Sequence, residues 1–231
     1  MNVSMIIGSP KTGNSCSATL LKQLETDLTG KAQGNAKNAF PVTTTTYQIR
    51  RNPLSLSDVE TVVASDVLVI AFPLYVDGVP SHVLRCLYQL EEAFHNSTSS
   101  KKPTCYVIIN CGFCEGKQNI NAVGIMQNFC KRSGIPFGQA FTAGGGEAIR
   151  SMIEANNPFG KGGLTYINTD WNQFVDHILA TEHAASCYCT PAYPSFIFRI
   201  IGNHFFWDQL AKKNGISKKQ MKARRSYTKR P

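Results

Sequence analysis

The sequence contains no apolar run close to the roughly 20 residues that a membrane-spanning helix needs, although it is 231 residues long. Residues 1–7 carry no basic stretch, and the apolar run that they hold is too short for a signal peptide. We therefore expect a protein that stays in the cytoplasm, where it is made.

Two nucleotide-binding motifs are also missing. There is no GxGxxG run, and the second predicted strand ends at Ile49 without an Asp or Glu for a ribose, which argues against a Rossmann dinucleotide site. The glycine-rich loop that begins at Gly8 lacks the GK[ST] ending of a P-loop, which argues against an NTPase.

The cysteine pattern does not indicate a metal centre. Eight cysteines without a signal peptide are expected to be reduced thiols. Cys111 and Cys114 form a CxxC pair, but no second pair stands at the spacing that a zinc or iron–sulfur site needs. A redox pair and half of a metal site remain open alternatives. We favour unrelated thiols and predict no bound metal.

Acidic residues are scarce at the C-terminal end. Residues 205–231 hold nine Lys or Arg and one acid, which gives a charge of +8. Residues 1–204 hold 15 Lys or Arg and 14 acids, which gives a charge of +1. The body of the chain is thus nearly neutral and its end is strongly basic.

Short β-rich runs alternate with amphipathic helical stretches, which is typical of βαβ units around a parallel sheet. The apolar run 67–72 fits a central parallel strand covered on both faces. We predict an α/β domain over residues 1–182 with a doubly wound five-stranded parallel sheet, followed by a C-terminal helical extension over 183–231. The predicted strands are 2–7, 43–49, 67–72, 105–110 and 136–143, and the predicted helices lie near 15–29, 57–64, 83–94, 120–132 and 171–181, with Ser57 as N-cap of the second and Gly134 ending the fourth.

Ligands of such sheets bind beyond the carboxyl ends of the strands. The loops that follow four of the predicted strands are rich in Gly, Pro and hydroxyl or amide side chains, and we expect them to meet at one edge. In the first loop, Gly8 and Gly13 let the backbone bend beside a helix N-terminus, which suits a terminal phosphate. An ordinary capped turn is the alternative. The side chains that would donate to a phosphate are Ser9, Asn14, Ser15 and Ser17.

The other loops carry aromatic rings. Tyr75 follows Pro73 in the second loop and is predicted to lie against a flat ligand, the alternative being an exposed aromatic on a turn. Phe113, together with Gly144 and Gly145, would provide a second wall and close backbone approach.

These loops resemble those of a known family. Gly8-Ser9-Pro10-Lys11-x-x-Asn14-Ser15 and the run 73–78 resemble motifs of flavodoxin-like NAD(P)H-dependent FMN reductases, and the runs 110–113 and 212–215 resemble features of one branch. The resemblance implies a flavodoxin-like fold, FMN as cofactor and NAD(P)H as reductant. It implies that Ser9, Lys11, Asn14, Ser15 and Ser17 surround the FMN phosphate, and that Pro73, Leu74, Tyr75 and Val76 border the isoalloxazine, with Asn110, Gly112 and Phe113 opposite.

The function that this resemblance implies is an FMN-dependent oxidoreductase. It would pass a hydride from NAD(P)H through FMN to a small acceptor such as a quinone, a flavin or a nitro compound, and the flavin would carry the chemistry. Tyr75 is the one side chain that we name as a proton donor, and N–H groups near Gly112 and Gly145 would stabilise the reduced ring. The alternative is a flavodoxin-type electron carrier. Such carriers tend to be acidic, and the neutral body disfavours that alternative.

The extension is apolar and aromatic over 194–207 and basic afterwards. We expect a helix packed on the body or on a second subunit, and hence a homodimer. An interfacial membrane helix and a nucleic-acid-binding tail over 212–230 are alternatives. A solvated basic terminus is the favoured interpretation, so we expect contact with neither membrane nor nucleic acid.

Overall fold

The computed structural model describes residues 1–11, 13–34, 41–154, 165–190, 196, 200, 204 and 207–223. The chain divides into two compact units, Met1–Pro191 and Ala192–Pro231. Within the described residues, no helix has both the length and the apolar character to cross a bilayer.

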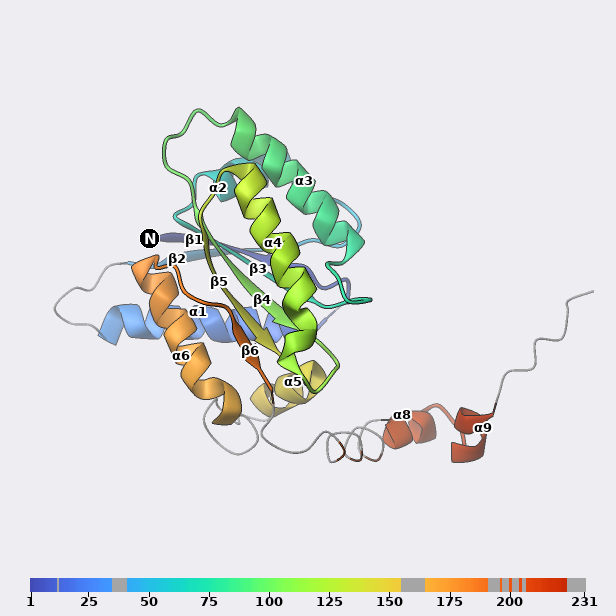
Figure 1. Ribbon diagram of the computed structural model, residues 1–231. Helices are drawn as coiled ribbons and strands as arrows, with labels where there is room; N and C mark the ends of the chain where they lie inside the picture. Colours follow the sequence, from blue (N-terminus) through green and yellow to red (C-terminus); the bar gives the residue numbers. More distant parts are fainter. Residues whose placement is uncertain are drawn as a thin grey trace, which may run out of the picture. The chain divides into compact units, whose positions relative to one another are not determined.

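The first unit is built on a parallel sheet of six strands in the order β2-β1-β3-β4-β5-β6 (Figure 1). The strand order reverses between β1 and β3, which makes this the flavodoxin-type doubly wound arrangement with its ligand-binding switch point at β1 and β3. The strands are β1 (Asn2–Ile7), β2 (Thr43–Gln48), β3 (Val67–Pro73), β4 (Thr104–Asn110), β5 (Phe137–Ala143) and β6 (Cys187–Cys189).

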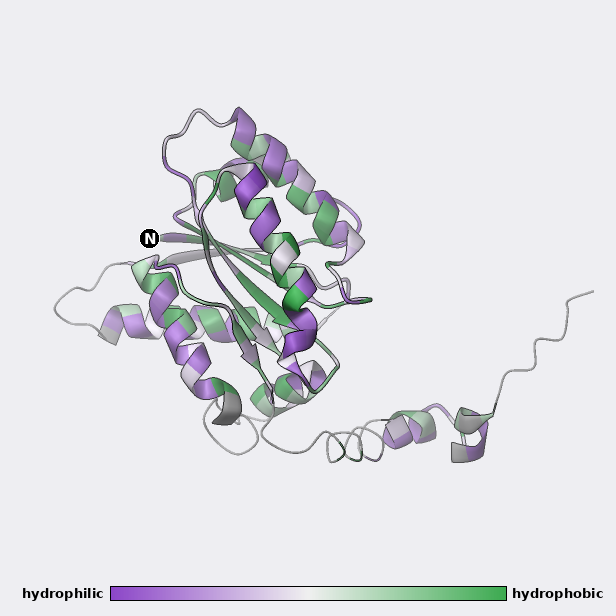
Figure 2. Cartoon of the chain, in the orientation of Figure 1, coloured by the Kyte–Doolittle hydropathy of each residue, from purple (hydrophilic) through white to green (hydrophobic). Residues whose placement is uncertain are grey.

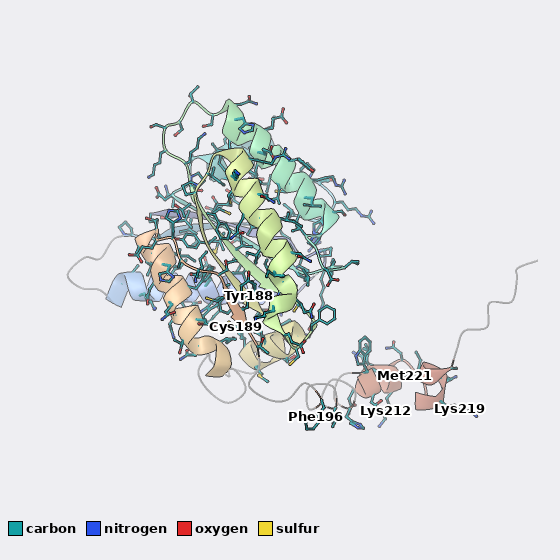
Figure 3. All side chains as sticks on the ribbon, viewed as in Figure 1. Tyr188, Cys189, Phe196, Lys212, Lys219 and Met221 are labelled. Carbon is teal, nitrogen blue, oxygen red and sulfur yellow. The ribbon has the colours of Figure 1, made fainter. Side chains whose placement is uncertain are left out.

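The sixth strand corrects the prediction of five. β6 pairs in parallel with β5, with Phe141 opposite Cys187 and Ala143 opposite Cys189. Figure 3 labels Tyr188 and Cys189 on this strand. The hydroxyl of Thr142 donates to the carbonyl of Cys187 at 2.8 Å, which adds a side-chain bond to the pairing. β6 lies within the first unit, although the sequence analysis assigned its residues to the extension.

Helices cover both faces of the sheet (Figure 1). Both faces need cover because alternate residues of β3 are apolar on each side. Ile70 and Phe72 belong to one apolar cluster, and Val69 and Ala71 belong to a second. Figure 2 shows the central strands as hydrophobic and the helices as two-sided. The first cluster is covered by α2 (Leu56–Val63), α3 (Ser81–Asn96) and α4 (Ile120–Ser133), and the second by α1 (Cys16–Gly34), α5 (Gly146–Glu154) and α6 (Thr165–Ala180).

Helix termini follow the expected chemistry with one correction. α4 ends at Gly134, whose φ of 65° is the left-handed C-cap that the sequence predicts. Ser57 was predicted to cap α2, and this is wrong. α2 begins at Leu56, so its N-cap is Ser55. The side chain of Ser55 accepts from the N–H of Asp58 at 3.2 Å, since an N-cap oxygen reaches the N–H three residues later.

The described part of the second unit includes two short helices, α8 (Asp208–Lys213) and α9 (Lys218–Lys222). α8 ends at Lys213, and the left-handed Gly215 follows its C-cap, Asn214. Ser217 caps α9 in a capping box with Gln220. The predicted apolar helix over 194–207 falls outside the described residues except at four positions. The side chains of Phe196, Lys212, Lys219 and Met221 in this unit are exposed (Figure 3).

Candidate functional site

A cavity of about 180 Å³ lies at the carboxyl ends of β1, β3 and β4, beside the switch point of the sheet. A larger hollow of about 620 Å³ borders the amino ends of β1 and β2, away from that point. Because ligands of doubly wound sheets bind at the carboxyl ends, the smaller cavity is the candidate site. It is lined by Ser9, Lys11, Ser15, Cys16, Ser17, Pro73, Leu74, Tyr75, Asn110, Cys111, Gly112, Gly146 and Glu147.

The start of α1 forms one end of this cavity. The hydroxyl oxygen of Ser15, a side chain only 3% exposed, accepts from the N–H of Ala18 at 3.2 Å and so caps the helix. In the described part of the chain, the backbone N–H groups of Cys16 and Ser17 have no acceptor. Two unpaired N–H groups at the positive end of a helix dipole form a site suited to an anion.

Ser17 and Asn110 link this loop to the end of β4. The hydroxyl of Ser17 donates to Oδ1 of Asn110 at 2.8 Å, and both side chains are buried. The hydroxyl hydrogen of Ser17 therefore points to Asn110, and the residue offers an anion its backbone N–H. Gly146 approaches this pair so closely that an added Cβ would lie 2.9 Å from Nδ2 of Asn110.

Charged side chains line the cavity beside the start of α1. Nζ of Lys11 lies 3.5 Å from Oε1 of Glu147, and Nε of Arg150 donates to Oε2 of Glu147 at 2.8 Å. Burial raises the pKa of the Glu147 carboxyl, but the hydrogen bond and charge of Arg150, together with Lys11, outweigh it and hold that pKa below its usual range. Glu147 is therefore ionised at neutral pH.

Both Glu147 and Arg150 belong to α5, a helix that the sequence analysis missed. The sequence feature that could have revealed α5 is the spacing of its charged residues, since Arg150 pairs with Glu147 at i−3 and with Glu154 at i+4.

Two exposed aromatic side chains belong to loops that line the cavity. Tyr75 is 48% exposed and Phe113 is 52% exposed, on the loops after β3 and β4 respectively. Tyr75 and Gly78 exchange two backbone hydrogen bonds of 3.1 Å, which closes a two-residue turn. Val76 (φ 48°) and Asp77 (φ 55°) occupy the turn, and two positive φ values are the mark of a type I′ turn.

Val76 is strained in this turn, because a β-branched residue at positive φ is an outlier. Its side chain is fully exposed, so it gains no packing in return. We expect Val76→Gly to stabilise the folded chain by about 1 kcal/mol, since glycine adopts this backbone conformation without a steric penalty. Urea unfolding of the two proteins measures this change. A destabilised Val76→Gly variant would contradict the assignment of strain.

The glycine loop after β5 serves the fold more than the ligand. The N–H of Gly145 donates to the carbonyl of Phe113 at 2.7 Å, so it is not free to stabilise a reduced ring as the sequence analysis expected. The N–H of Gly112 has no acceptor among the described residues and keeps that role open. The predicted site residues that do not line the cavity are Asn14, which borders a separate hollow beside α1 and α5, and Val76, Phe113, Gly144 and Gly145.

Two thiols that the sequence analysis did not assign to the site also line the cavity. Burial, followed by the charge of Glu147, raises the pKa of the Cys16 thiol to about 12, and burial also raises the pKa of Cys111. Both thiols are protonated at neutral pH, which makes them weak nucleophiles. All eight cysteines are free, and the described residues contain no group of three or more His, Cys, Asp or Glu side chains placed to hold a metal.

Comparison with known proteins supports the fold. No protein-family model and no curated protein matches the chain. Among solved structures, it is similar to an NADH:FMN oxidoreductase (EMOB) in its apo form, with a TM-score of 0.53 and 14% identity over 84% of this chain and 92% of that one. It is also similar to an oxidoreductase from Corynebacterium diphtheriae, with a TM-score of 0.53 and 12% identity over 78% of this chain and 96% of that one. The predicted resemblance to flavodoxin-like FMN reductases is thus confirmed at the level of the fold.

Proposed function

We propose that this chain is an FMN-dependent oxidoreductase that uses NAD(P)H to reduce a small acceptor such as a quinone, a flavin or a nitro compound. The observation that carries the proposal is the two-ended character of the site. N–H groups at the start of α1 that have no acceptor among the described residues, together with Lys11, line one part of the cavity, and the half-exposed ring of Tyr75 lines another. A ligand with a phosphate at one end and a flat ring at the other matches both.

The residues present fit FMN. The phosphate would accept hydrogen bonds from the N–H groups of Cys16 and Ser17 and from the hydroxyl of Ser9, with Lys11 as counter-charge. A cavity of about 180 Å³ is smaller than the roughly 300 Å³ or more of typical ligand pockets. The ring would therefore extend out of the cavity, over the half-exposed side chain of Tyr75.

FMN, when bound, supplies hydride and electron transfer. The chain's own residues would position the ligand, with Ser9, Lys11 and the start of α1 at its phosphate and Tyr75 beside its ring. The N–H of Gly112, which has no acceptor among the described residues, would be available to a ring atom that gains negative charge. Tyr75 lines the cavity and is half exposed, so its hydroxyl would serve as the proton donor. No protein nucleophile is needed, which is consistent with the protonated thiols of Cys16 and Cys111.

An anaerobic titration of the FMN-loaded protein tests the proposal. Addition of NADPH, and in a separate sample NADH, is followed through the blue absorption band of the flavin. We expect rapid bleaching by at least one of the two nucleotides. A band that persists with both but bleaches with dithionite would overturn the oxidoreductase assignment and favour an electron carrier.

A further inference from the structure

Glu147 is the feature of the site that the proposed function does not explain. A carboxylate lines a cavity whose neighbouring groups suit an anion, and it does so in the first turn of α5. The positive end of the α5 dipole stabilises an acid there. Glu147 is thus a resident anion at the end of the cavity where the phosphate of FMN would bind.

Glu147 pairs with two cations, of which Lys11 lines the cavity and would serve a phosphate. It pairs with Lys11 at 3.5 Å and with Arg150 at 2.8 Å. A flavin phosphate carries nearly two negative charges at neutral pH. When it binds beside Lys11, it must compete with Glu147 for that ammonium group and is repelled by the carboxylate.

The arrangement allows this competition without destroying the site. The side chain of Glu147 is 45% exposed, so the carboxylate can turn toward water. Its bond to Arg150, three residues along the same helix, does not depend on Lys11. Glu147 can therefore give up Lys11 and keep Arg150.

We propose that Glu147 is a specificity-determining residue, whose carboxylate competes with the flavin phosphate for Lys11 and so reduces the preference of the site for FMN over riboflavin. The proposal rests on the proposed function, because it takes the cavity as the FMN site. Riboflavin has the same ring and ribityl chain but no phosphate, so it does not meet this competition.

Equilibrium dialysis of the flavin-free protein against FMN, and separately against riboflavin, at neutral pH and low salt tests the proposal. We expect Glu147→Gln to raise the affinity for FMN about fivefold, as suits an ion pair between half-exposed side chains, and to leave the affinity for riboflavin unchanged. Glu154→Gln is the matched control. It makes the same chemical change on the same helix and pairs with the same Arg150, but Glu154 does not line the cavity. It should change neither affinity.

A second comparison isolates the role of Lys11. In a Lys11→Gln background, Glu147→Gln should give a smaller gain in FMN affinity, because the contested cation is gone. An undiminished gain in that background would overturn the competition. So would equal effects of Glu147→Gln on FMN and riboflavin, or a loss of FMN affinity. Failure of the proposed function is a separate result, in which the unaltered protein binds neither flavin.

Discussion

Ser15→Asp is expected to lower the affinity for FMN on the order of 100-fold, because two unit charges a few ångströms apart at a partly buried site repel by several kcal/mol. Ser15 is buried at the start of α1, so an aspartate there cannot turn away from a phosphate as Glu147 can. Aspartate is as good an N-cap as serine, and the helix should therefore remain capped. The affinity for riboflavin should change little.

The matched control is Ser15→Asn. The asparagine side chain has nearly the same shape as aspartate and also caps a helix, but it carries no charge. Equilibrium dialysis with both flavins gives the comparison. We expect Ser15→Asn to retain most of the FMN affinity. Equal FMN affinities for the two variants would place the phosphate elsewhere than at the start of α1.

Gly144→Ala is expected to destabilise the folded chain by about 3 kcal/mol or more, at the upper end of what overpacking costs. A Cβ at this position would lie 1.9 Å from the carbonyl oxygen of Cys114, which is backbone and cannot turn aside. The N–H of Gly144 also donates to the carbonyl of Cys189 at 3.1 Å. Movement of the glycine loop to relieve the clash would therefore disturb the contact with β6.

Gly124→Ala controls for the loss of glycine itself. Gly124 lies within α4, and no atom outside its own helix stands within 4 Å of an added Cβ. Alanine is the better helix former, so we expect a gain of about 1 kcal/mol. Urea unfolding measures both variants. A Gly144→Ala variant that unfolds at the urea concentration of the unaltered protein would contradict the clash.

The sequence predicted those parts of the fold whose signal is local. The strand and helix alternation, the stop at Gly134 and the buried side of α6, where Trp171 and Phe174 are fully enclosed, follow from residue period and cap chemistry. α5 and β6 were missed because neither element carries such a local signal. α5 begins in a run of three glycines that suggests a loop, and β6 has three residues, too few to show a period.

The candidate site was predictable as a set of loops but not in its detail. Parallel strands bring their following loops to one edge, which is why Ser9, Tyr75 and Gly112 line one cavity. Glu147 was missed because its place depends on α5. The strained turn at Val76 was not predictable, since β-branched residues disfavour the φ that the turn imposes.

We expect FMN to bind at the carboxyl ends of β1, β3 and β4. The most direct test is equilibrium dialysis of the flavin-free protein against FMN, with the Ser15→Asp variant in parallel. We expect the unaltered protein to saturate at about one FMN per chain, as binding in this cavity allows, and the variant to take up little. No uptake of FMN by the unaltered protein, or equal uptake by both proteins, would contradict it.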